Sequence, residues 1–335
     1  MSIQEKVLLL LEENKNKALS GEEIASRLGC TRAAIWKAIK SLKSNGYEIE
    51  AVNNKGYTLK VSADILSEAY IKEQVADITK STLIKVEKVV DSTNNILKNL
   101  ANSGMYDDMI LIAEEQTAGR GRRGRSFYSP KDSGVYISFL LHPNIPVSEA
   151  SMLTTLAVTA EALAIEAVSG MDVSIKWVND LYMRNKKISG ILTEASTSIE
   201  DGSLEYAVVG IGINIYEPEN GFPEEIKDLA GSIFTDNIAR ENLKNQLVSS
   251  FITNFMKFYN EKTELNKISR SYIKEYEKRC TAIGKNITIL TPDHKPVQNN
   301  STAYVIGINE NCNLIVRYED GSEAILSNGE ISIRL

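Results

Sequence analysis

The chain has few cysteines and histidines, and their scarcity excludes two kinds of site. Its three cysteines, Cys30, Cys280 and Cys312, are scattered, and with only two histidines they form neither a zinc-ligand spacing nor a disulfide framework. Scattered cysteines favour a reducing compartment. No apolar run approaches the ~20 residues needed to cross a bilayer, and the first residues do not begin a signal peptide. We therefore expect a cytoplasmic protein that does not enter a membrane.

Length and charge indicate several domains with different surfaces. At 335 residues the chain is too long for one ordinary domain, so two or three domains with real cores are expected. The net charge of −6 is unevenly distributed. Residues 1–60 carry ten lysines and arginines against seven acidic residues, which gives +3 there and −9 for the remainder. The N-terminal part is therefore the one suited to a polyanion.

The N-terminal segment has the pattern of a winged helix-turn-helix. An apolar stripe predicts a first helix, and its members are Ile3, Val7, Leu10 and Leu11. Ser20 and Glu23 have the spacing of a capping box that opens a second helix, and Gly29 is placed to close it. Thr31 is placed to cap a third helix.

The third helix separates a core face from a basic face. The core face consists of Ile35, Ile39 and Leu42, and the other face carries Arg32, Trp36, Lys37, Lys40 and Lys43. Alternation around residues 53–56 (NNKG) then predicts a hairpin, the wing. A basic helix face alone is commonly just solvated. Capped helices at close spacing, followed by a hairpin, favour binding to operator DNA, by a dimer because one such helix covers only a half-site.

Residues 119–125 (GRGRRGR) contain four arginines and three glycines. Each guanidinium offers a planar set of donors that fits phosphate or carboxylate, and the glycines permit positive φ and close approach of the backbone. So much positive charge in a folded domain indicates an anionic ligand. The apolar runs at 109–113 and 135–141, on either side, predict buried strands.

Three other interpretations compete for this segment. Its glycine spacing also fits the dinucleotide-binding fingerprint, but a helix must follow that motif, and residues 126–130 (SFYSP) do not start one. A disordered nucleic-acid-binding tract would repeat and would lack the apolar flanks. A solvated surface loop paired with carboxylates stays open, because composition alone does not exclude it.

The middle of the chain predicts a mixed α/β domain. An apolar stripe predicts a long helix over 150–169, opened by Ser148 and ended by Gly170. Strands are predicted at 173–177, 181–183, 187–194 and 204–215. Short connections between consecutive strands make an antiparallel sheet.

Glycines and charges gather in these strands and their turns. The interrupting glycines are Gly190, Gly210 and Gly212. Such glycines usually mark a bulge or a ligand that lies against the backbone, and a tight contact between helix and sheet is the alternative. Lys176, Asp180 and Lys187 flank the same turns, so one carboxylate and two ammonium groups can share one opening. An ordinary surface ion-pair cluster explains the same three residues.

The last part of the chain predicts a small β module. Its alternating apolar residues over 281–335, with Asp320 and Gly321 as a hairpin turn, are typical of an SH3-like barrel. Helices are predicted before it over 242–259 and 267–280. The sequence thus predicts an α+β protein of three domains, at residues 1–62, 63–280 and 281–335.

Four segments of the middle domain resemble, in order and spacing, the motifs of the biotin protein ligases. They are residues 119–125, 176–180 (KWVND), 187–192 (KISGIL) and 210–214 (GIGIN). Together with the helix-turn-helix and residues 329–334 (GEISIR), they make the chain similar over nearly its whole length to the bifunctional biotin ligases and biotin operon repressors. The resemblance implies a central domain of the class II synthetase-like kind, and a C-terminal module that either assists ATP and acceptor binding or is a structural cap.

The resemblance implies a two-step reaction. Biotin and Mg-ATP would give biotinyl-5′-AMP and pyrophosphate, and a lysine of the biotin carboxyl carrier domain of acetyl-CoA carboxylase would attack the mixed anhydride. Such chemistry needs cations in a water-poor site. The sequence has no Walker motif, which leaves the arginine-rich loop to hold ATP. Biotinyl-5′-AMP would also be the corepressor, ordering loops so that a homodimer forms on paired half-sites.

By resemblance, functional residues can be assigned to each ligand. The biotin-binding residues are Ser92, Thr93, Asn94, Gln116, Arg120, Arg122, Lys187, Gly190 and Ile191. The residues for ATP or the adenylate are Arg122, Arg125, Lys176, Asn179, Lys187 and Asn214. The catalytic set is Arg122, Lys176, Asp180 and Lys187. Asp180 is a candidate either for Mg²⁺ coordination or for taking the proton of the acceptor lysine, whose free pKa is ~10.4. The resemblance does not decide between these roles.

Two positions depart from the family pattern. Val178 replaces the proline usual in the Lys-Trp-x-Asn-Asp motif, which implies a less rigid turn, and Phe127 stands where a tryptophan is common. Neither change removes a reacting group. Two other functions fit the same fold: a biotin-sensing repressor without catalysis, and a lipoate-type acyl ligase. The retained catalytic set opposes the first, and the biotin-type arginine loop opposes the second.

Overall fold

The structure, a computed structural model, describes the chain apart from short segments. These are residues 1, 15–16, 45–46, 48, 53–54, 60–63, 80, 106, 144, 199–201, 237, 239, 262, 264–267, 291–300, 328–331 and 335. The chain divides into two compact units. One comprises Met1–Asp77 and Asn237–Ser250, and the other comprises Ile78–Asp236 and Phe251–Leu335.

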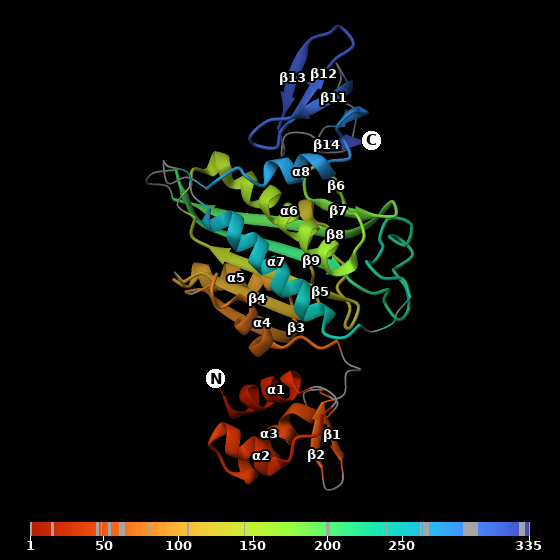
Figure 1. Ribbon diagram of the computed structural model, residues 1–335. Coiled ribbons are helices and arrows are strands. Elements are labelled where there is room, and N and C mark those ends of the chain that lie inside the picture. The colour runs from red at the N-terminus through yellow and green to blue at the C-terminus, as the bar shows by residue number, and fades with distance from the viewer. Residues whose placement is uncertain are drawn as a thin grey trace. The chain divides into compact units, whose positions relative to one another are not determined.

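The first unit begins with three short helices and a hairpin. They are α1 (Ile3–Glu13), α2 (Gly21–Leu28), α3 (Arg32–Ser44), β1 (Ile49–Val52) and β2 (Gly56–Leu59), and α4 (Glu68–Val75) follows (Figure 1). The apolar faces of the three helices and the hairpin enclose one core, in which Val7, Ile24 and Ile35 are fully buried. This is the predicted winged helix-turn-helix arrangement.

Local signals at α2 are confirmed with one change. The Ser20 hydroxyl accepts from the Glu23 amide at 3.0 Å, and Gly29 ends the helix in the left-handed conformation. The Glu23 carboxylate, however, accepts from Arg27 one turn further along the helix. The predicted capping box is therefore only half formed, because a pairing of opposite charges at i, i+4 takes the carboxylate away from the cap.

The first helix has the complete capping box instead. The Ser2 hydroxyl accepts from the Glu5 amide, and the Glu5 carboxylate accepts from the Ser2 amide. Ile3, predicted on the buried stripe, is 44% exposed. It lies in the first turn, where the helix begins beside the cap, and Leu8 takes its place in the core.

The wing needs glycine at one position. Gly56 starts β2 with φ +112°, and a Cβ there would lie 2.0 Å from the Leu19 carbonyl oxygen. Leu19 and Tyr57 exchange backbone hydrogen bonds across this contact, which ties the hairpin to the segment before α2. The turn residues 53–54 lie outside the described residues, and β1 pairs with β2 on either side of them as predicted.

The second unit is built on a seven-stranded sheet of order β3-β4-β5-β9-β8-β7-β6. The strands are β3 (Leu83–Val90), β4 (Met109–Gln116), β5 (Gly134–Leu141), β6 (Ser174–Lys176), β7 (Asp180–Met183), β8 (Lys186–Thr197) and β9 (Leu204–Asn214). All neighbours pair antiparallel except β3 and β4, which are parallel. The predicted mixed, mainly antiparallel sheet is confirmed.

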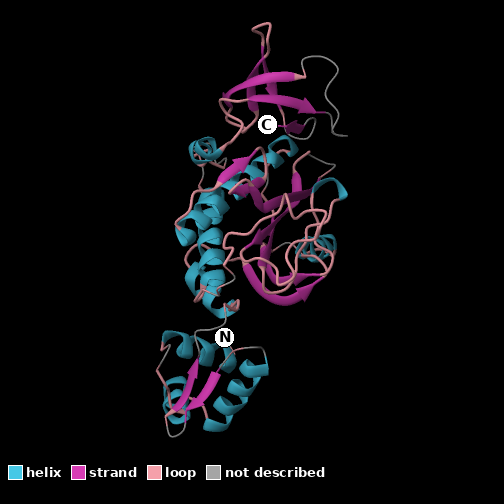
Figure 2. Ribbon diagram, turned by 90° about the vertical axis from the view of Figure 1, so that its right-hand side faces the viewer, coloured by secondary structure: helices cyan, strands magenta, loops and turns pink. Residues whose placement is uncertain are grey.

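Helices cover this sheet on both faces. Because side chains alternate along a strand, Gly190, Leu192 and Glu194 of β8 lie on one face and Ser189 and Thr193 on the other. The first face contacts α5 (Thr93–Asn102), and the second packs against α6 (Ala150–Ser169). Figure 2 shows long helices along one side of the curved central sheet.

The core helix α6 corrects two predictions. It follows a short 3-10 turn, η2 (Val147–Glu149), so Glu149 rather than Ser148 is its N-cap residue, while Gly170 ends it as predicted. Within the described chain α6 is the one helix long and apolar enough to span a membrane by length and composition. The prediction that no apolar run approaches that length is therefore wrong. Because 72% of the helix window is buried inside the fold, α6 serves as core.

The C-terminal strands form an antiparallel sheet that stays open. They are β10 (Asn286–Leu290), β11 (Thr302–Ile308), β12 (Leu314–Arg317), β13 (Glu323–Leu326) and β14 (Ser332–Arg334), in the order β13-β12-β11-β10-β14. Gly321, with φ +83°, turns the chain between β12 and β13 as predicted. In the described ladder β13 and β14 are the two edges, so a closed SH3-like barrel is not confirmed.

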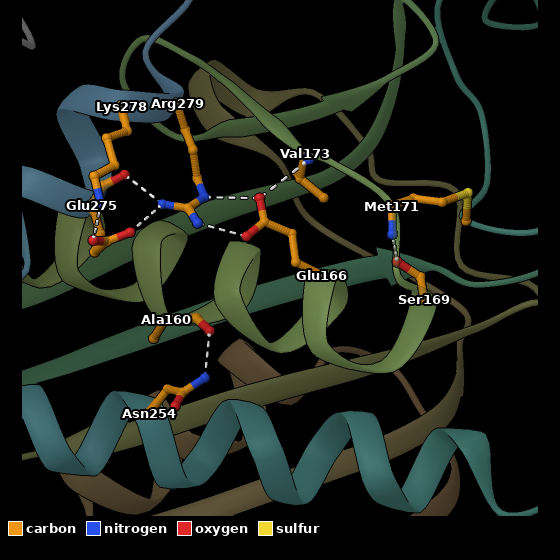
Figure 3. A network of polar contacts seen from close by, with 9 residues as sticks. All are labelled: Ala160, Glu166, Ser169, Met171, Val173, Asn254, Glu275, Lys278 and Arg279. Atoms are coloured by element: carbon orange, nitrogen blue, oxygen red, sulfur yellow. Dashed lines mark hydrogen bonds and ion pairs between the residues drawn. The ribbon is translucent and has the colours of Figure 1, made fainter.

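Two helices precede this sheet along the chain. They are α7 (Leu243–Asn260), close to its predicted bounds, and α8 (Ile273–Arg279), which is much shorter than the predicted 267–280. Arg279 at the end of α8 donates to the Glu166 carboxylate of α6 at 2.9 Å and to the Glu275 carboxylate at 2.8 Å (Figure 3). This bidentate pairing, which is half-buried, fixes α8 against the core helix.

Candidate active site

One face of the central sheet is hollowed at three glycines. Gly190 of β8 pairs in register with Gly212 of β9, and Gly210 lies two residues before Gly212. A Cβ at Gly210 would lie 1.9 Å from Oδ1 of Asn94, and a Cβ at Gly212 would lie 2.4 Å from the Phe127 ring. The β8–β9 ladder is regular at these positions, so the glycines make room for side chains from α5 and from the segment after β4.

Polar side chains over this hollow hold one another in place. The Thr93 amide and hydroxyl both donate to Oε1 of Gln116, at 2.9 and 3.2 Å. The Ser138 hydroxyl lies 2.7 Å from the Thr93 hydroxyl and 2.6 Å from Oδ1 of Asn94. Thr93, Asn94 and Ser138 are buried, so each bond forms away from water. The network presents fixed donors and acceptors at the wall of a cavity.

That cavity is narrow, and Arg120 is one of the residues that line it. It is lined by Ser92, Thr93, Asn94, Gln116, Arg120, Phe127, Gly190, Leu192, Gly210, Ile211 and Gly212, and its volume is about 20 Å³. This is room for about one water molecule. Arg120 donates to Oδ1 of Asn95 and to the Glu194 carboxylate, each at 3.0 Å. At this volume the cavity has no room for a ligand larger than about one water molecule.

Glu194 is the counter-ion of Arg120. Burial by itself raises the pKa of its carboxyl, but hydrogen bonds from Lys98 and Asn94, with the charge of Arg120, outweigh burial and lower that pKa. The Lys98 ammonium lies 2.7 Å from one carboxylate oxygen and the Asn94 amide 3.0 Å from the other. Glu194 is therefore ionised and holds Arg120 against the sheet.

A second arginine connects the arginine loop to the segment before β7. Arg122 donates to Oδ1 of Asn179 at 2.7 Å, and the Asn179 amide group donates to Oδ1 of Asp180 at 3.1 Å. The Lys187 ammonium donates to the same Asp180 oxygen at 2.6 Å. Burial lowers the pKa of the Arg122 guanidinium, and the Asp180 carboxylate opposes that shift. Two cations and one carboxylate thus share one opening, but the second cation is Arg122 and not the predicted Lys176.

A bulge in β8 aims Lys187 at this opening. Asp180 pairs with Gly190 and Leu181 with Ser189, but Tyr182 pairs with Lys187, so one residue of β8 is passed over. The side chain of Lys187 therefore turns toward Gly190, where an added Cβ would lie 2.9 Å from its Nζ. Bulges commonly re-aim a side chain beside a functional site.

The other predicted residues are placed less directly. Ile191 donates its amide to the Asn179 carbonyl and lines, with Arg122, a second cavity of about 170 Å³ beside α6. Asn214 donates to the Gly231 carbonyl at 3.0 Å. Arg125 is exposed on the loop and lines neither cavity. The Lys176 ammonium lies over the Tyr182 ring, 5.4 Å from its centroid, rather than in an ion pair with Asp180.

Sequence inspection missed two residues of the site. Ser138 is the one polar residue in the apolar run at 135–141, and that break in the pattern is a usable signal. Glu194 follows Gly190 and Leu192 at a period of two, which places it on the same face of β8. Its partners Lys98 and Arg120 are distant in the chain, so no local sequence pattern predicts that these three charged residues meet.

The basic face of α3 is a separate candidate surface. All five predicted side chains, Arg32, Trp36, Lys37, Lys40 and Lys43, are exposed. Trp36 is 56% exposed, and the Lys40 ammonium lies 5.4 Å from the centroid of its ring. A large exposed aromatic beside several cations is unusual on a solvated helix and is suited to a nucleic acid.

The acidic residues do not assemble a metal site by themselves. Across the described part of the chain, no group of three His, Cys, Asp or Glu side chains lies where it could hold a metal ion. Asp180 is the one carboxylate at the opening described above, and its Oδ1 already accepts from Lys187 and Asn179. Mg²⁺ is usually held by one or two carboxylates together with substrate phosphates.

Comparisons with known proteins agree with both surfaces. Residues 86–214 match the biotin/lipoate A/B protein ligase family, and residues 3–58 match a helix-turn-helix (HTH) domain family. The bifunctional ligase/repressor BirA of Bacillus subtilis is 37% identical over 232 residues, which are 69% of this chain and 71% of the relative. BirA of Escherichia coli is 34% identical over 196 residues, 58% of this chain and 59% of the relative.

A solved structure supports the same assignment. The biotin protein ligase of Aquifex aeolicus, in complex with biotin and ATP, superposes with a TM-score of 0.58 at 26% identity and covers 75% of this chain and 98% of its own. The glycine hollow, the arginine loop and the Asp180–Lys187 pair thus lie within the matched ligase region. This chain belongs to the family of bifunctional biotin ligases and repressors of the BirA type.

Proposed function

We infer that this chain is an ATP-dependent biotin ligase that also represses transcription in response to biotin. The ligase forms biotinyl-5′-AMP and transfers biotin to a lysine of the biotin carboxyl carrier protein of acetyl-CoA carboxylase. The observation that carries this proposal is the chain of contacts from Arg122 through Asn179 and Asp180 to Lys187. It joins the arginine loop to the sheet beside a cavity with fixed polar walls.

In the first step the biotin carboxylate attacks the α-phosphorus of ATP and pyrophosphate leaves. Two anions must approach each other, and this costs free energy unless cations lie where the charge develops. Arg122 and Lys187 supply two such charges, already oriented by Asn179 and Asp180. We assign to Thr93, Asn94 and Gln116 the orientation of the uncharged head of biotin; their position in the cavity lining supports this assignment.

In the second step the acceptor amine attacks the acyl carbon and AMP leaves. The amine must lose a proton, because a lysine with a pKa of ~10.4 is largely protonated at neutral pH. Asp180 is the carboxylate nearest the Lys187 ammonium, and we assign it the acceptance of that proton. Lys187 would then shift toward the phosphate of the adenylate, which leaves Asp180 Oδ1 with the Asn179 amide as its remaining donor.

Magnesium has a supporting part in this proposal. Among the residues that the structure describes, none assemble a metal site of their own, so we propose that Mg²⁺ enters with the phosphates of ATP. The use of ATP fits the cytoplasmic location that the scattered cysteines predict, and all three cysteines are free. No step of the reaction is assigned to the metal.

The repressor activity is assigned to the first unit. Its α3 face carries four cations and an exposed tryptophan, and DNA half-sites are read by such a helix. We propose that biotinyl-5′-AMP favours a homodimer, because two copies are needed to cover two half-sites. The five-stranded C-terminal sheet is proposed to act as an SH3-like module that assists ATP and acceptor binding.

The test is an acceptor biotinylation assay. Purified protein, ATP, biotin and a carrier domain are combined, and modification of one carrier lysine is expected by mass spectrometry. Product that needs both ATP and biotin supports the ligase. If biotin binds but no ATP-dependent product forms, the chain is a sensor without catalysis. Lipoate in place of biotin serves as the matched control, and its transfer would contradict the assignment.

A further inference from the structure

A buried carboxyl lies behind the Asp180–Lys187 pair and has no part in the reaction described so far. Glu161 on α6 is 0% exposed, and so is Ser189 on β8. Within the described chain, the two carboxyl oxygens of Glu161 and the hydroxyl oxygen of Ser189 have no hydrogen-bond partner of normal geometry. The helix and the strand pack against each other, and the Thr154 and Thr193 hydroxyls, unlike the Glu161 and Ser189 groups, are hydrogen-bonded across the same layer. Buried polar groups without partners are rare and call for an explanation.

The carboxyl is uncharged, because an ion at this depth would be strongly penalised. Burial raises the pKa of Glu161 to about 8, against a smaller opposing effect of the Ser189 hydroxyl. The site residues also act on it: the Asp180 carboxylate raises this pKa, and the Lys187 ammonium lowers it. Glu161 therefore responds to the charge of the opening on the other side of β8.

Other charged groups on the elements around α6 have partners of their own. Glu149, at η2, pairs with Arg270, and Arg279 of α8 pairs with Glu166. The Tyr276 hydroxyl of α8 donates to a backbone carbonyl, and Lys176 of β6 lies over an aromatic ring. On β9 the neighbouring residues are apolar. Asp180 from β7 and Lys187 from β8 are thus the charges that act on Glu161.

The position of Ser189 in β8 links Glu161 to the backbone that orients Lys187. It pairs with Leu181 of β7 and Ile213 of β9. It stands between the bulge that turns Lys187 and the glycine that makes room for the Lys187 ammonium. A shift of Ser189 toward α6 would therefore move the backbone that aims Lys187.

We propose that the Glu161 carboxyl and the Ser189 hydroxyl form an uncharged support beneath β8 that adds no charge to compete with an anionic substrate for the Lys187 ammonium. Glu161 is then a positioning residue, and this role rests on the proposed ligase function. Linkage makes the effect reciprocal: an ionised Glu161 competes with the biotin carboxylate for Lys187, and a bound anion disfavours that ionisation. Affinity for biotin should fall as Glu161 loses its proton.

The experiment is biotin-dependent exchange of pyrophosphate into ATP, measured from about pH 6 to 9. In the wild-type protein we expect KM for biotin to rise about threefold to tenfold between pH 7 and pH 9, the size of one added charge near the site. In Glu161→Gln, whose amide cannot ionise, KM should stay level over that range. In Ser189→Ala the rise should begin at higher pH, since the hydroxyl that favours the ionised form is gone.

Glu166→Gln is the matched control, because it removes a carboxylate from the same helix that is paired with Arg279 (Figure 3). It should follow the wild-type profile. If Glu161→Gln shows the wild-type rise in KM, the inference is wrong and the ligase proposal stands. If Glu161→Gln does not fold by circular dichroism, an unshifted profile in Ser189→Ala overturns the inference. Absence of exchange in the wild type at every pH would refute the ligase function itself.

Discussion

The two charged surfaces of this protein use their cations in opposite ways. On α3 the cations stand exposed, with no acidic residue between Thr31 and Tyr47. In the central domain Arg120 is held by Glu194, Arg122 by Asn179, and Lys187 by Asp180. A long polyanion can be met by flexible exposed charges, because each contact is worth little and many add up. A small ligand needs few charges at fixed positions.

The largest expected effect on activity comes from removing the Lys187 ammonium from the ion-paired cations of the central domain. Lys187→Ala removes the ammonium that neutralises the reacting anions and leaves Asp180 without its ion-pair partner. We expect adenylate formation, measured by pyrophosphate exchange, to fall about a hundredfold to a thousandfold. Thermal unfolding of the helix-turn-helix should stay unchanged. Exchange at the wild-type rate would mean that the pair is an ordinary surface ion pair.

Removing exposed lysines from the basic face of α3 should weaken DNA binding in smaller steps. Lys37→Ala with Lys43→Ala removes two candidate phosphate contacts on α3, and operator affinity should fall about tenfold or more. The slope of log affinity against log salt should become less steep by about 1.8. Lys6→Ala, an exposed lysine on α1, is the control for charge alone. Equal salt slopes in all variants would show that the α3 face is merely solvated.

Where local patterns govern, the sequence was a reliable guide. Ser20, Thr31 and Gly29 cap their helices as predicted, because capping depends on a few consecutive residues. The antiparallel order of β6 to β9 follows from short connections. The sequence also predicts Asp180 beside Lys187, whereas the predicted third member of that cluster, Lys176, lies over the Tyr182 ring instead.

Contacts between distant segments are not predictable from local sequence patterns. The parallel pairing of β3 with β4 and the cluster around Glu194 join residues that no local period relates. The C-terminal alternation predicts strands, but closure of a barrel depends on how its edges meet, and β13 and β14 stay apart in the described ladder. Glu23 shows a local competition that propensity does not settle, since Arg27 draws it from the cap.

Stability should depend on pH through the buried Glu161. Its pKa of about 8 exceeds the ordinary 4.5, so between these values the folded chain keeps a proton that the unfolded chain has released. Stability from this group is full below about pH 4.5 and is lost as pH rises toward 8, at most by about 1.4 kcal/mol per pH unit. Glu161→Gln lacks this loss. Urea denaturation should show the variant gaining on the wild type as pH rises, whereas parallel curves would contradict the neutral carboxyl.

The smallest effect tests how firmly the arginine loop is held. Glu194→Gln removes the charge that binds Arg120 to the sheet but keeps a side chain of the same shape. A partly exposed ion pair is worth about 0.5–1 kcal/mol, so biotinyl-5′-AMP should dissociate about twofold to fivefold faster if Glu194 steadies the closed loop. Glu205→Gln, an exposed carboxylate on β9, is the control. Slower dissociation would contradict the role of Glu194 in holding the closed loop. Glu194 would then compete with the ligand for Arg120. In that case the ligand would have to break the ion pairs of the central domain before it could use their cations.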